Sequence, residues 1–317
     1  MSSFETERPK VSTLLPQEWS GKNYDASVFA LGFESRATNL LDTVRGKSQT
    51  AFALGFNHGH ERAFEVNKTR FENADVQIYK SLSDEAFENV FKEIMGALKD
   101  DAGRTVFVDI SCFNRFRLAA LVHEVFMLAQ TRHHELIVDF AYSVAEFEKP
   151  TLTEHPNTVV GPVHPAFAGW SQGGYSSTAA VLGLGYEQDQ ALGAAEYLQA
   201  GEVWAFAPNS PISKYRPEVS KANKLLIAEM PPSHLIEYDV CSPVSVIATL
   251  ESVVRGLSGE HSVVLVPFGP KIFVLCSLVL AAIQQDIAVW RVSQESHIEP
   301  HDRRASNVAV GLRLIFP

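Results

Sequence analysis

Two stretches far apart in the chain decide its fold because they repeat one pattern: FALGFESRA at residues 29–37 and LGLGYEQDQ at residues 182–190. In each stretch a short apolar run leads into a glycine, an aromatic residue and a glutamate. A buried strand that ends in a polar, glycine-containing loop has this pattern. Its recurrence indicates that the chain contains an internal repeat.

Other short segments recur in the same order along the chain. WSGKNY at residues 19–24 matches WSQGGY at residues 170–175, and EVNK at residues 65–68 matches EVSK at residues 218–221. The spacing between the partners of each match is nearly constant. We therefore predict that the two halves of the chain arose by duplication and share one architecture.

Each half alternates short apolar runs with segments of helical periodicity. Strand-like runs such as SVFALGF and TVFVDIS are followed by helix-like segments such as SRATNLLDTV at residues 35–44. Buried parallel strands with helices on both faces produce this alternation. The sequence predicts an α/β fold of two tandem, internally duplicated Rossmann-like domains with mostly parallel sheets, at residues 14–160 and 161–317, related by a pseudo-two-fold axis. The C-terminal run VAVGLRLIF predicts an extra edge strand in the second domain.

Composition and charge limit the possible partners. The chain has 317 residues, 46% of them hydrophobic, and a formal net charge of −10. Because long nucleic acids bind basic surfaces, we expect no DNA or RNA partner, whereas a small anion in a local pocket is compatible with this charge. The three widely spaced cysteines (Cys112, Cys241 and Cys276) and an N-terminus without a secretory signal predict a cytoplasmic protein with reduced thiols.

One segment, SVVLVPFGPKIFVLCSLVLAAI at residues 262–283, is long and apolar enough to imitate a membrane span. Pro267, Gly269, Pro270 and Lys271 interrupt it near one end. We therefore predict a strand, a tight loop and a buried helix, and we expect no membrane partner.

The loop after the first strand of each half is a candidate ligand site. The carboxyl ends of the strands bind ligands in Rossmann-like folds, so two such edges facing each other would enclose one pocket. A glycine lets the backbone approach a ligand, and a carboxylate accepts hydrogen bonds from a ribose or a base. Alternatively, the glycine makes a tight turn and the glutamate opens a helix. The candidates are Gly32, Glu34, Ser35 and Arg36 in the first half and Gly185, Glu187 and Gln188 in the second.

The loop after the fourth strand carries polar and cationic residues directly after a buried run. A helix N-terminus with an arginine or a lysine nearby is a frequent anion site. The alternative is that Arg115 and Arg117 are solvated and that the stem of Lys271 lies along apolar surface. The candidates here are Asp109, Ser111, Asn114 and Arg115 in the first half and Gly269 and Lys271 in the second.

The loop after the second strand adds Asn57 in the first half and Asn209 and Ser210 in the second. His58 and His60 form a His-x-His pair of the kind that ligates metals. No third ligand lies at a useful spacing and the second half lacks both histidines, so we predict no metal. The G-x-G-x-x-G fingerprint is absent, and we predict no cofactor.

Three residues are candidates for catalysis. Glu34 and Glu187 have the chemistry of an acid and base pair, and Lys271 is the third candidate. No spacing in the sequence indicates a catalytic triad. We expect Trp19 and Trp170 to pack against the domains, and we expect the polar cluster HIEPHDRR at residues 297–304 to be a solvated surface.

The segment VVLVPFGPKIFVLCSLVLAA resembles one carried by CARF-type domains, in which a strand enters a Gly/Thr-rich loop with a lysine and then an apolar helix. CARF and the related SAVED domains are Rossmann-like sensors of cyclic oligonucleotides in bacterial antiviral defence, and SAVED itself fuses two CARF-like units. The resemblance implies that Gly269 and Lys271 contact phosphate and that residues 32–36 contact the nucleotide. Phe268-Gly269-Pro270 stands where the family has Gly-Gly-Thr.

The sequence thus favours a nucleotide-binding sensor module of a bacterial defence-type system. Its ligand is expected to be a nucleotide, with cyclic oligonucleotides as one class, bound between the two halves, and its output is expected through a partner protein. One alternative is an enzyme, a phosphodiesterase, other hydrolase or transferase, acting on a nucleotide or small phosphorylated substrate in the same pocket. Another is a non-catalytic structural or interaction subunit. Ligand turnover would indicate the enzyme, and stabilisation by ligand without turnover the sensor.

Overall fold

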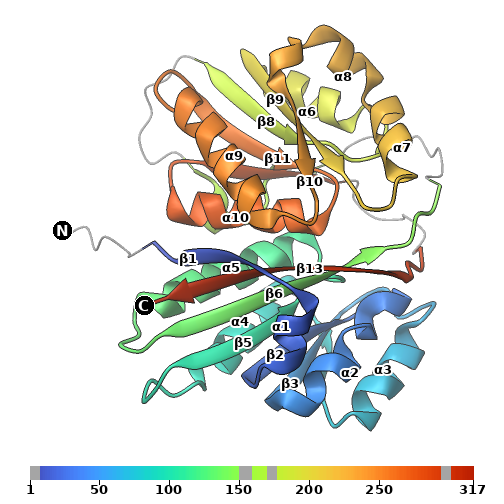
Figure 1. Ribbon diagram of the computed structural model, residues 1–317, viewed down its shortest axis with the longest axis vertical. Helices are drawn as coiled ribbons and strands as arrows, with labels where there is room; N and C mark the ends of the chain where they lie inside the picture. Colours follow the sequence, from blue (N-terminus) through green and yellow to red (C-terminus); the bar gives the residue numbers. More distant parts are fainter. Residues whose placement is uncertain (1–7, 150–158, 170–176, 294–300) are drawn as a thin grey trace. The chain divides into compact units, whose positions relative to one another are not determined.

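The computed structural model describes residues 8–149, 159–169, 177–293 and 301–317. The chain divides into two compact units (Figure 1). Unit 1 comprises Met1–Glu146 together with Pro300–Pro317, and unit 2 comprises Phe147–Glu299. Each unit has its own sheet and its own hydrophobic core.

Unit 1 contains a seven-stranded sheet in the order β1-β13-β6-β5-β2-β3-β4. Five strands, β6 to β4 in that order, are parallel, β13 is antiparallel to β6, and β1 is antiparallel to β13. The strands are β1 (Lys10–Leu14), β2 (Tyr24–Leu31), β3 (Ser48–Phe56), β4 (Gln77–Leu82), β5 (Arg104–Asp109), β6 (Leu136–Ala145) and β13 (Ala305–Phe316). The helices are α1 (Pro16–Gly21), α2 (Leu41–Val44), α3 (Phe64–Asn73), α4 (Asp84–Gly96) and α5 (Arg115–Ala129), with 3₁₀ turns η1 (Ser35–Thr38) and η2 (Arg45–Lys47).

Unit 2 contains a six-stranded sheet in the order β10-β9-β8-β11-β12-β7. Five of these strands are parallel, and β7 is antiparallel to β12. The strands are β7 (Val159–Pro162), β8 (Thr178–Gly183), β9 (Glu202–Asn209), β10 (Leu235–Asp239), β11 (Ser262–Pro267) and β12 (Ala288–Ser293). The helices are α6 (Gln190–Tyr197), α7 (Tyr215–Ala222), α8 (Lys224–Glu229), α9 (Pro243–Leu257) and α10 (Lys271–Ile283), with 3₁₀ turns η3 (Pro165–Phe167) and η4 (Pro232–His234).

The five parallel strands of the two units follow the same path. In each unit the chain lays down a central strand, adds two strands on one side, crosses back and adds two on the other. This is the Rossmann-like order, and it places helices on both faces of the sheet. In unit 1, α4 and α5 lie together on one face and α1 to α3 lie on the other (Figure 1). The predicted α/β class with two Rossmann-like domains and mostly parallel sheets is therefore confirmed.

The C-terminal strand does not follow the predicted domain boundaries. Residues 161–317 were predicted to form one domain, yet β13 pairs with β6 of unit 1, from Ala309 opposite Ser143 to Phe316 opposite Leu136. The edge strand of unit 2 is instead covered by β7, which precedes that sheet in the chain. Both open edges are apolar and need a covering strand, so composition could not indicate which edge β13 would take.

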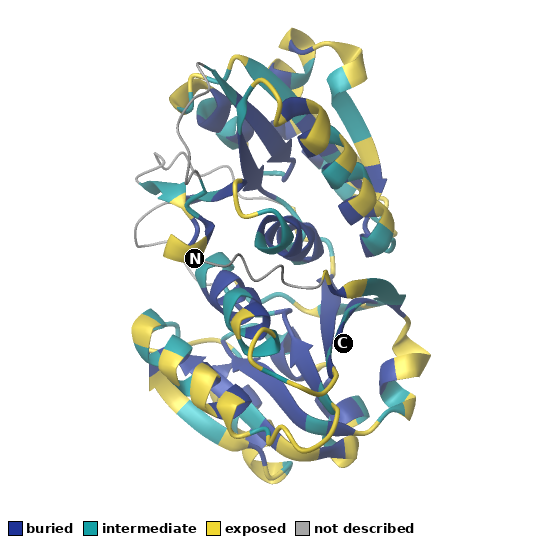
Figure 2. Cartoon of the chain, turned by 90° about the vertical axis from the view of Figure 1, so that its left-hand side faces the viewer, coloured by how far each residue is buried: buried dark blue, intermediate teal, exposed yellow. Residues whose placement is uncertain are grey.

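Aromatic packing forms the centre of unit 1. Phe107 on β5 contacts the rings of Trp19, Tyr24 and Phe29, with ring centroids 5.4 to 6.5 Å apart. All four side chains are buried. Figure 2 shows that the strands within each unit are mostly buried, whereas the exposed residues lie mainly on the outer helices and loops. Gly311 makes this packing possible, because a Cβ there would lie 2.9 Å from the Trp19 ring. The expected packing role of Trp19 is confirmed, while Trp170 and the rest of its WSQGGY segment lie outside the described residues.

The segment that imitated a membrane span folds as predicted. Residues 262–267 form β11, a loop follows at Phe268 to Pro270, and α10 begins at Lys271. Cys276 on α10 is fully buried, and this burial raises the pKa of its thiol. Across the described parts of the chain, every helix is too short or too polar to cross a bilayer.

A buried ion pair ties β13 to unit 1. The Arg313 guanidinium donates to both oxygens of Asp139 on β6, at 2.7 and 2.8 Å, and the Tyr24 hydroxyl donates to Asp139 Oδ2 at 2.9 Å. Asp139 is fully buried. Its carboxylate raises the pKa of Arg313, mainly through the hydrogen bond between them. The carboxylate therefore depends on a residue from the far end of the chain for its compensating charge.

We expect Arg313→Met to destabilise unit 1 by about 3 kcal/mol, because removing one partner leaves a buried carboxylate without its counter-charge. Urea denaturation, with hydrogen exchange to locate the loss, measures this. Arg255→Met is the matched control: Arg255 pairs with Glu251 but is 73% exposed, and its loss should cost at most about 0.5 kcal/mol. Equal effects of the two changes would contradict the assignment of β13 to unit 1.

Candidate functional site

The topological switch point of each unit lies between the first and the fourth of its five parallel strands, counted along the chain; the loops that follow these strands are called the first-strand and fourth-strand loops. These strands are β2 and β5 in unit 1 and β8 and β11 in unit 2. Connections from two such strands leave the sheet toward opposite faces, which makes their carboxyl ends the usual ligand edge of an open α/β sheet. The two loops predicted as the main candidates lie at this point in both units. Their role in binding a ligand stays a prediction.

In unit 1 the two loops of the switch point touch. A Cβ placed on Gly32 would lie 3.7 Å from the Cβ of Cys112 in the fourth-strand loop. The Cys112 thiol lies 4.0 Å from Glu34 Oε2. Sequence reasoning thus grouped Gly32 and Glu34 correctly with the loop that begins at Asp109.

Arg36 is only 2% exposed and is held inside the unit. Its Nε lies 2.5 Å from Glu34 Oε2, and its Nη1 donates to the Ser143 carbonyl at 3.0 Å. Burial by itself would lower the pKa of this guanidinium, but Glu34, through its charge and its hydrogen bond, together with Tyr142 and Cys112 raises the pKa well above its usual value. Arg36 therefore orients Glu34 and joins the first-strand loop to β6, a structural role that sequence reasoning did not predict.

Asp109 and Ser111 shape the fourth-strand loop of unit 1. Asp109 Oδ1 accepts hydrogen bonds from the backbone N–H and the hydroxyl of Ser111. The Ser111 hydroxyl oxygen accepts from the Ser143 N–H at 2.8 Å. Both side chains are buried. They fix the loop backbone between β5 and β6.

Asn114 and Arg115 lie at the start of α5. The Asn114 side chain caps the helix by accepting from the Arg117 N–H at 2.8 Å, and Arg115 is half-buried. The alternative interpretation, that Arg117 is solvated, is wrong. Its guanidinium is fully buried between the rings of Phe56 and Phe87, at 3.8 and 4.7 Å. It donates to the carbonyls of Gly55 and Leu82 and to Asp84.

Residues 301–304 cover the first-strand loop of unit 1. Asp302 accepts from the Ser35 N–H at 2.6 Å and from the Ser35 hydroxyl at 2.5 Å, and the Arg303 carbonyl accepts from the Arg36 N–H. The prediction that residues 297–304 form a solvated surface is therefore wrong for residues 302 and 303, which contact the first-strand loop. Residues 297–300 lie outside the described residues. Residues 301–304 lead directly into β13. The pairing of β13 with β6 therefore also places Asp302 and Arg303 against the first-strand loop.

A buried asparagine holds the first-strand loop in both units. Asn67 on α3 donates to the carbonyls of Gly32 and Glu34, at 2.9 and 2.8 Å. Asn223, between α7 and α8, donates to the Gly185 carbonyl at 2.7 Å. Each asparagine is 1% exposed. Sequence matching had paired Asn67 with Ser220, three positions before Asn223, so the equivalence was missed.

The two loops of unit 2 also touch. Gly269 has a φ of +77°, and a Cβ there would lie 2.5 Å from the Leu184 carbonyl oxygen. Only glycine therefore permits this close approach of the fourth-strand loop to the first-strand loop. Glu187 lies against Gly185, with its Oε2 buried, and Gln188 is exposed. Lys271 is the first residue of α10 and is half-buried.

The second-strand loops show no metal-binding geometry. His58 Nδ1 contacts the side chain of Asn57, whereas His60 Nε2 contacts the Phe56 carbonyl. Within the described ranges, no cluster of three or more His, Cys, Asp or Glu side chains could hold a metal ion. In unit 2 the Asn209 carbonyl accepts from Val240, and the Ser210 hydroxyl accepts from Ile212.

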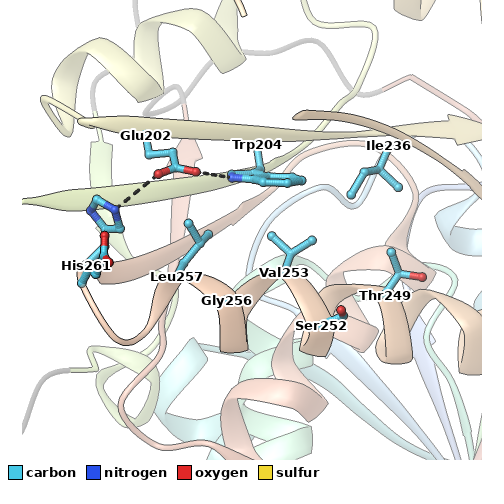
Figure 3. Close-up of a pocket in the computed structure, with 10 residues that line it drawn as sticks. Glu202, Trp204, Ile236, Thr249, Ser252, Val253, Gly256, Leu257 and His261 are labelled. Atoms are coloured by element: carbon cyan, nitrogen blue, oxygen red, sulfur yellow. Dashed lines mark hydrogen bonds and ion pairs between the residues drawn. The ribbon is translucent and has the colours of Figure 1, made fainter. Parts of the chain in front are cut away.

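A pocket of about 450 Å³ lies elsewhere, at the amino edge of the unit 2 sheet (Figure 3). Trp204 on β9 and Ile236 on β10 form one wall, and residues on the last turns of α9 form the wall opposite. Glu202 and His261 close one end of it. The residues contributed by α9 are Thr249, Ser252, Val253, Gly256 and Leu257.

Two residues at this end of the pocket, Glu202 and His261, connect it to Ser177, which lies beside His261 outside the pocket lining. Ser177 Oγ lies 2.6 Å from His261 Nδ1, and His261 Nε2 lies 3.3 Å from Glu202 Oε2. Trp204 Nε1 donates to the other carboxylate oxygen at 2.8 Å. None of these residues was predicted. The available signal was that Ser177, Glu202 and His261 each lie at the start of a strand, and that β9, β8 and β11 are neighbours.

Comparisons with known proteins add little to this description. No protein-family model matches the chain, and no curated protein matches it. A similar solved structure is the cytoplasmic domain of a prokaryotic cation chloride cotransporter, with 9% sequence identity, 85% of this chain and 95% of that chain covered, and a TM-score of 0.26.

We expect Asn67→Ala to lower the free energy of unfolding by about 2 kcal/mol, because it leaves two buried carbonyl groups without their hydrogen-bond donor. Urea denaturation measures the change. Asn73→Ala is the control on the same helix, since Asn73 is exposed and its loss should cost no more than about 0.5 kcal/mol. A similar small cost for both would show that Asn67 does not hold the loop.

Proposed function

We propose that the protein is a nucleotide-binding sensor module that binds its ligand at the switch points and signals through a separate partner protein. The observation that carries the proposal is the repeated switch point, where a buried asparagine holds the first-strand loop and this loop touches the fourth-strand loop in each unit. Preorganised loops at this edge are where open α/β sheets bind nucleotides. The proposal therefore rests on two independent copies of one arrangement.

The fourth-strand loop of unit 2 has the chemistry of a phosphate site. Gly269 turns the chain in the left-handed conformation, and α10 starts at Lys271 without a side-chain cap from Pro270. The N–H groups at the start of a helix and a lysine ammonium both favour an anion. This combination supports the phosphate contact that the CARF resemblance implied for Gly269 and Lys271.

The loops of unit 1 suit a different part of a nucleotide. The charge of Arg36 is matched by Glu34, and the Asn114 side chain caps α5. Carboxylate and hydroxyl oxygens are therefore the main features of this switch point, beside Arg115 at the start of α5. Oxygen acceptors of this kind bind ribose hydroxyls and base amino groups.

The resemblance to CARF and SAVED domains makes cyclic oligonucleotides the first ligand class to test, with a bacterial defence system as the setting. Both units have folds of the nucleotide-binding type, so the proposal places the output in another protein. A ligand that acts in this way stabilises the protein when it binds and is not consumed.

The test is a thermal-shift screen of the whole protein against cyclic oligonucleotides, linear nucleotides and inorganic phosphate. We expect at least one nucleotide to raise the melting temperature, and Lys271→Ala to weaken its binding roughly 10- to 100-fold through loss of a charge-assisted contact. Chromatography of the same mixture after incubation shows whether the nucleotide is consumed.

Arg255→Ala is the matched control, because it removes a positive charge from the end of α9 at the opposite edge of the same sheet. It should bind the nucleotide as the unchanged protein does. Equal weakening by both substitutions would indicate a nonspecific charge effect. Absence of any shift across the panel would refute nucleotide binding, and consumption of the ligand would favour the hydrolase alternative.

A further inference from the structure

We propose that Ser177, His261 and Glu202 form a nucleophile–base–acid relay that hydrolyses small neutral carboxylic esters whose acyl or aryl group enters the adjoining pocket of unit 2 while the ester carbonyl lies at Ser177. This activity is independent of nucleotide binding, since the relay lies at the amino edge of the sheet and the switch point lies at the carboxyl edge. The proposals of ester hydrolysis and of nucleotide binding can therefore be tested, and refuted, independently of each other.

The relay requires one tautomer of His261, with the ring proton on Nε2. A glutamate carboxylate is an acceptor only, and Glu202 Oε2 lies 3.3 Å from Nε2, so it suits this tautomer. In this tautomer Nδ1 carries a lone pair and lies 2.6 Å from Ser177 Oγ, so it can accept the hydroxyl proton that the reaction removes.

Glu202 is itself held in position. Its Oε1 accepts from the Trp204 indole N–H at 2.8 Å, which leaves Oε2 directed at His261 (Figure 3). The Trp204 ring stacks on His234 with centroids 4.3 Å apart, which restrains the indole. A nucleophile within reach of a base that a third group orients is the geometry of serine hydrolases.

The reaction balances with water as the only co-reactant. The Ser177 oxygen attacks the ester carbonyl carbon while its proton passes to His261 Nδ1. The carbon–oxygen bond to the alcohol breaks, and the alcohol leaves with that proton. Water then attacks the acyl group on Ser177, with His261 taking its proton and returning it to the serine oxygen, and the carboxylic acid is released.

The pocket indicates which esters would fit. Trp204, Ile236, Val253 and Leu257 line its walls, and a volume of about 450 Å³ suits a small acyl or aryl group. Glu202 and Glu260 make the lining acidic, and the chain has a net charge of −10. An anionic substrate would be repelled, so we assign a neutral apolar ester.

A purely structural role would not require this arrangement. The backbone ladders from β8 to β9 and from β8 to β11 already join the strands from which the relay projects. The His261 and Glu202 side chains additionally line a pocket that a substrate can enter. Reaction of Ser177 with a covalent probe would distinguish a catalytic role of these side chains from a purely structural one.

The experiment treats the whole protein with a fluorophosphonate probe, locates the labelled residue by mass spectrometry, and measures hydrolysis of p-nitrophenyl acetate. We expect the label on Ser177. Ser177→Ala should abolish labelling, and His261→Gln should slow ester hydrolysis at least about 100-fold. The control is Ser258→Ala, since Ser258 follows α9 and its hydroxyl donates to the Val254 carbonyl; it should keep full activity.

Two results would overturn the proposal. One is a probe that labels other residues but leaves Ser177 of the unchanged protein unmodified, a result that requires no variant to fold. The other is p-nitrophenyl acetate hydrolysis by a folded Ser177→Ala protein, verified by its melting temperature, at the rate of the unchanged protein. Loss of nucleotide binding in the Lys271→Ala protein has no bearing on either measurement.

Discussion

Both switch points depend on one kind of hydrogen bond, from a buried asparagine amide to the carbonyl of a glycine in the first-strand loop. Asn67 and Asn223 are almost completely buried, so the carbonyl groups they bind have no access to water. A buried carbonyl without a donor costs more than the net gain from a typical hydrogen bond. The amide therefore determines where the chain turns at the carboxyl edge of each sheet, and the remaining contacts of both loops are built on that turn.

Charged groups at the unit 1 switch point mainly stabilise the fold. Arg36 and Arg117 are both buried, and each connects elements through carbonyl groups as well as a carboxylate. Guanidinium groups suit this task because they carry five donors in a planar array. What remains for a ligand is the set of oxygen acceptors and backbone groups that these arginines hold in place.

The sequence was sufficient for the parallel strands, because buried strands produce continuous apolar runs that turn polar where they end. It also placed the candidate loops at the correct edge. It did not predict that residues 35–44 form a 3₁₀ turn and a short helix rather than one helix. The contacts of Ser35 and Arg36 with residues 302–303 constrain this segment, and such distant contacts have no local signal.

The relay of unit 2 was missed for a related reason. Ser177, Glu202 and His261 come together only because β8 lies between β9 and β11, and that order is a property of the sheet rather than of any spacing along the chain. The buried asparagines show the same limit, since Asn223 is displaced from the sequence match of Asn67 and acts from the junction of α7 and α8 rather than from within a helix. Side-chain chemistry of this kind becomes visible only once topology is known.

The position of β13 has a consequence for synthesis. Unit 2 is contiguous in the chain, whereas the unit 1 sheet includes a strand that is translated after all of unit 2. Domains usually fold as they emerge from the ribosome, with the N-terminal one first. Here the order of completion is reversed: the nascent first unit waits with β6 as an open edge and Asp139 without Arg313, while the second unit can already close. Until β13 has been synthesised, unit 1 is thus the part of the protein whose exposed strand edge is most open to wrong pairing.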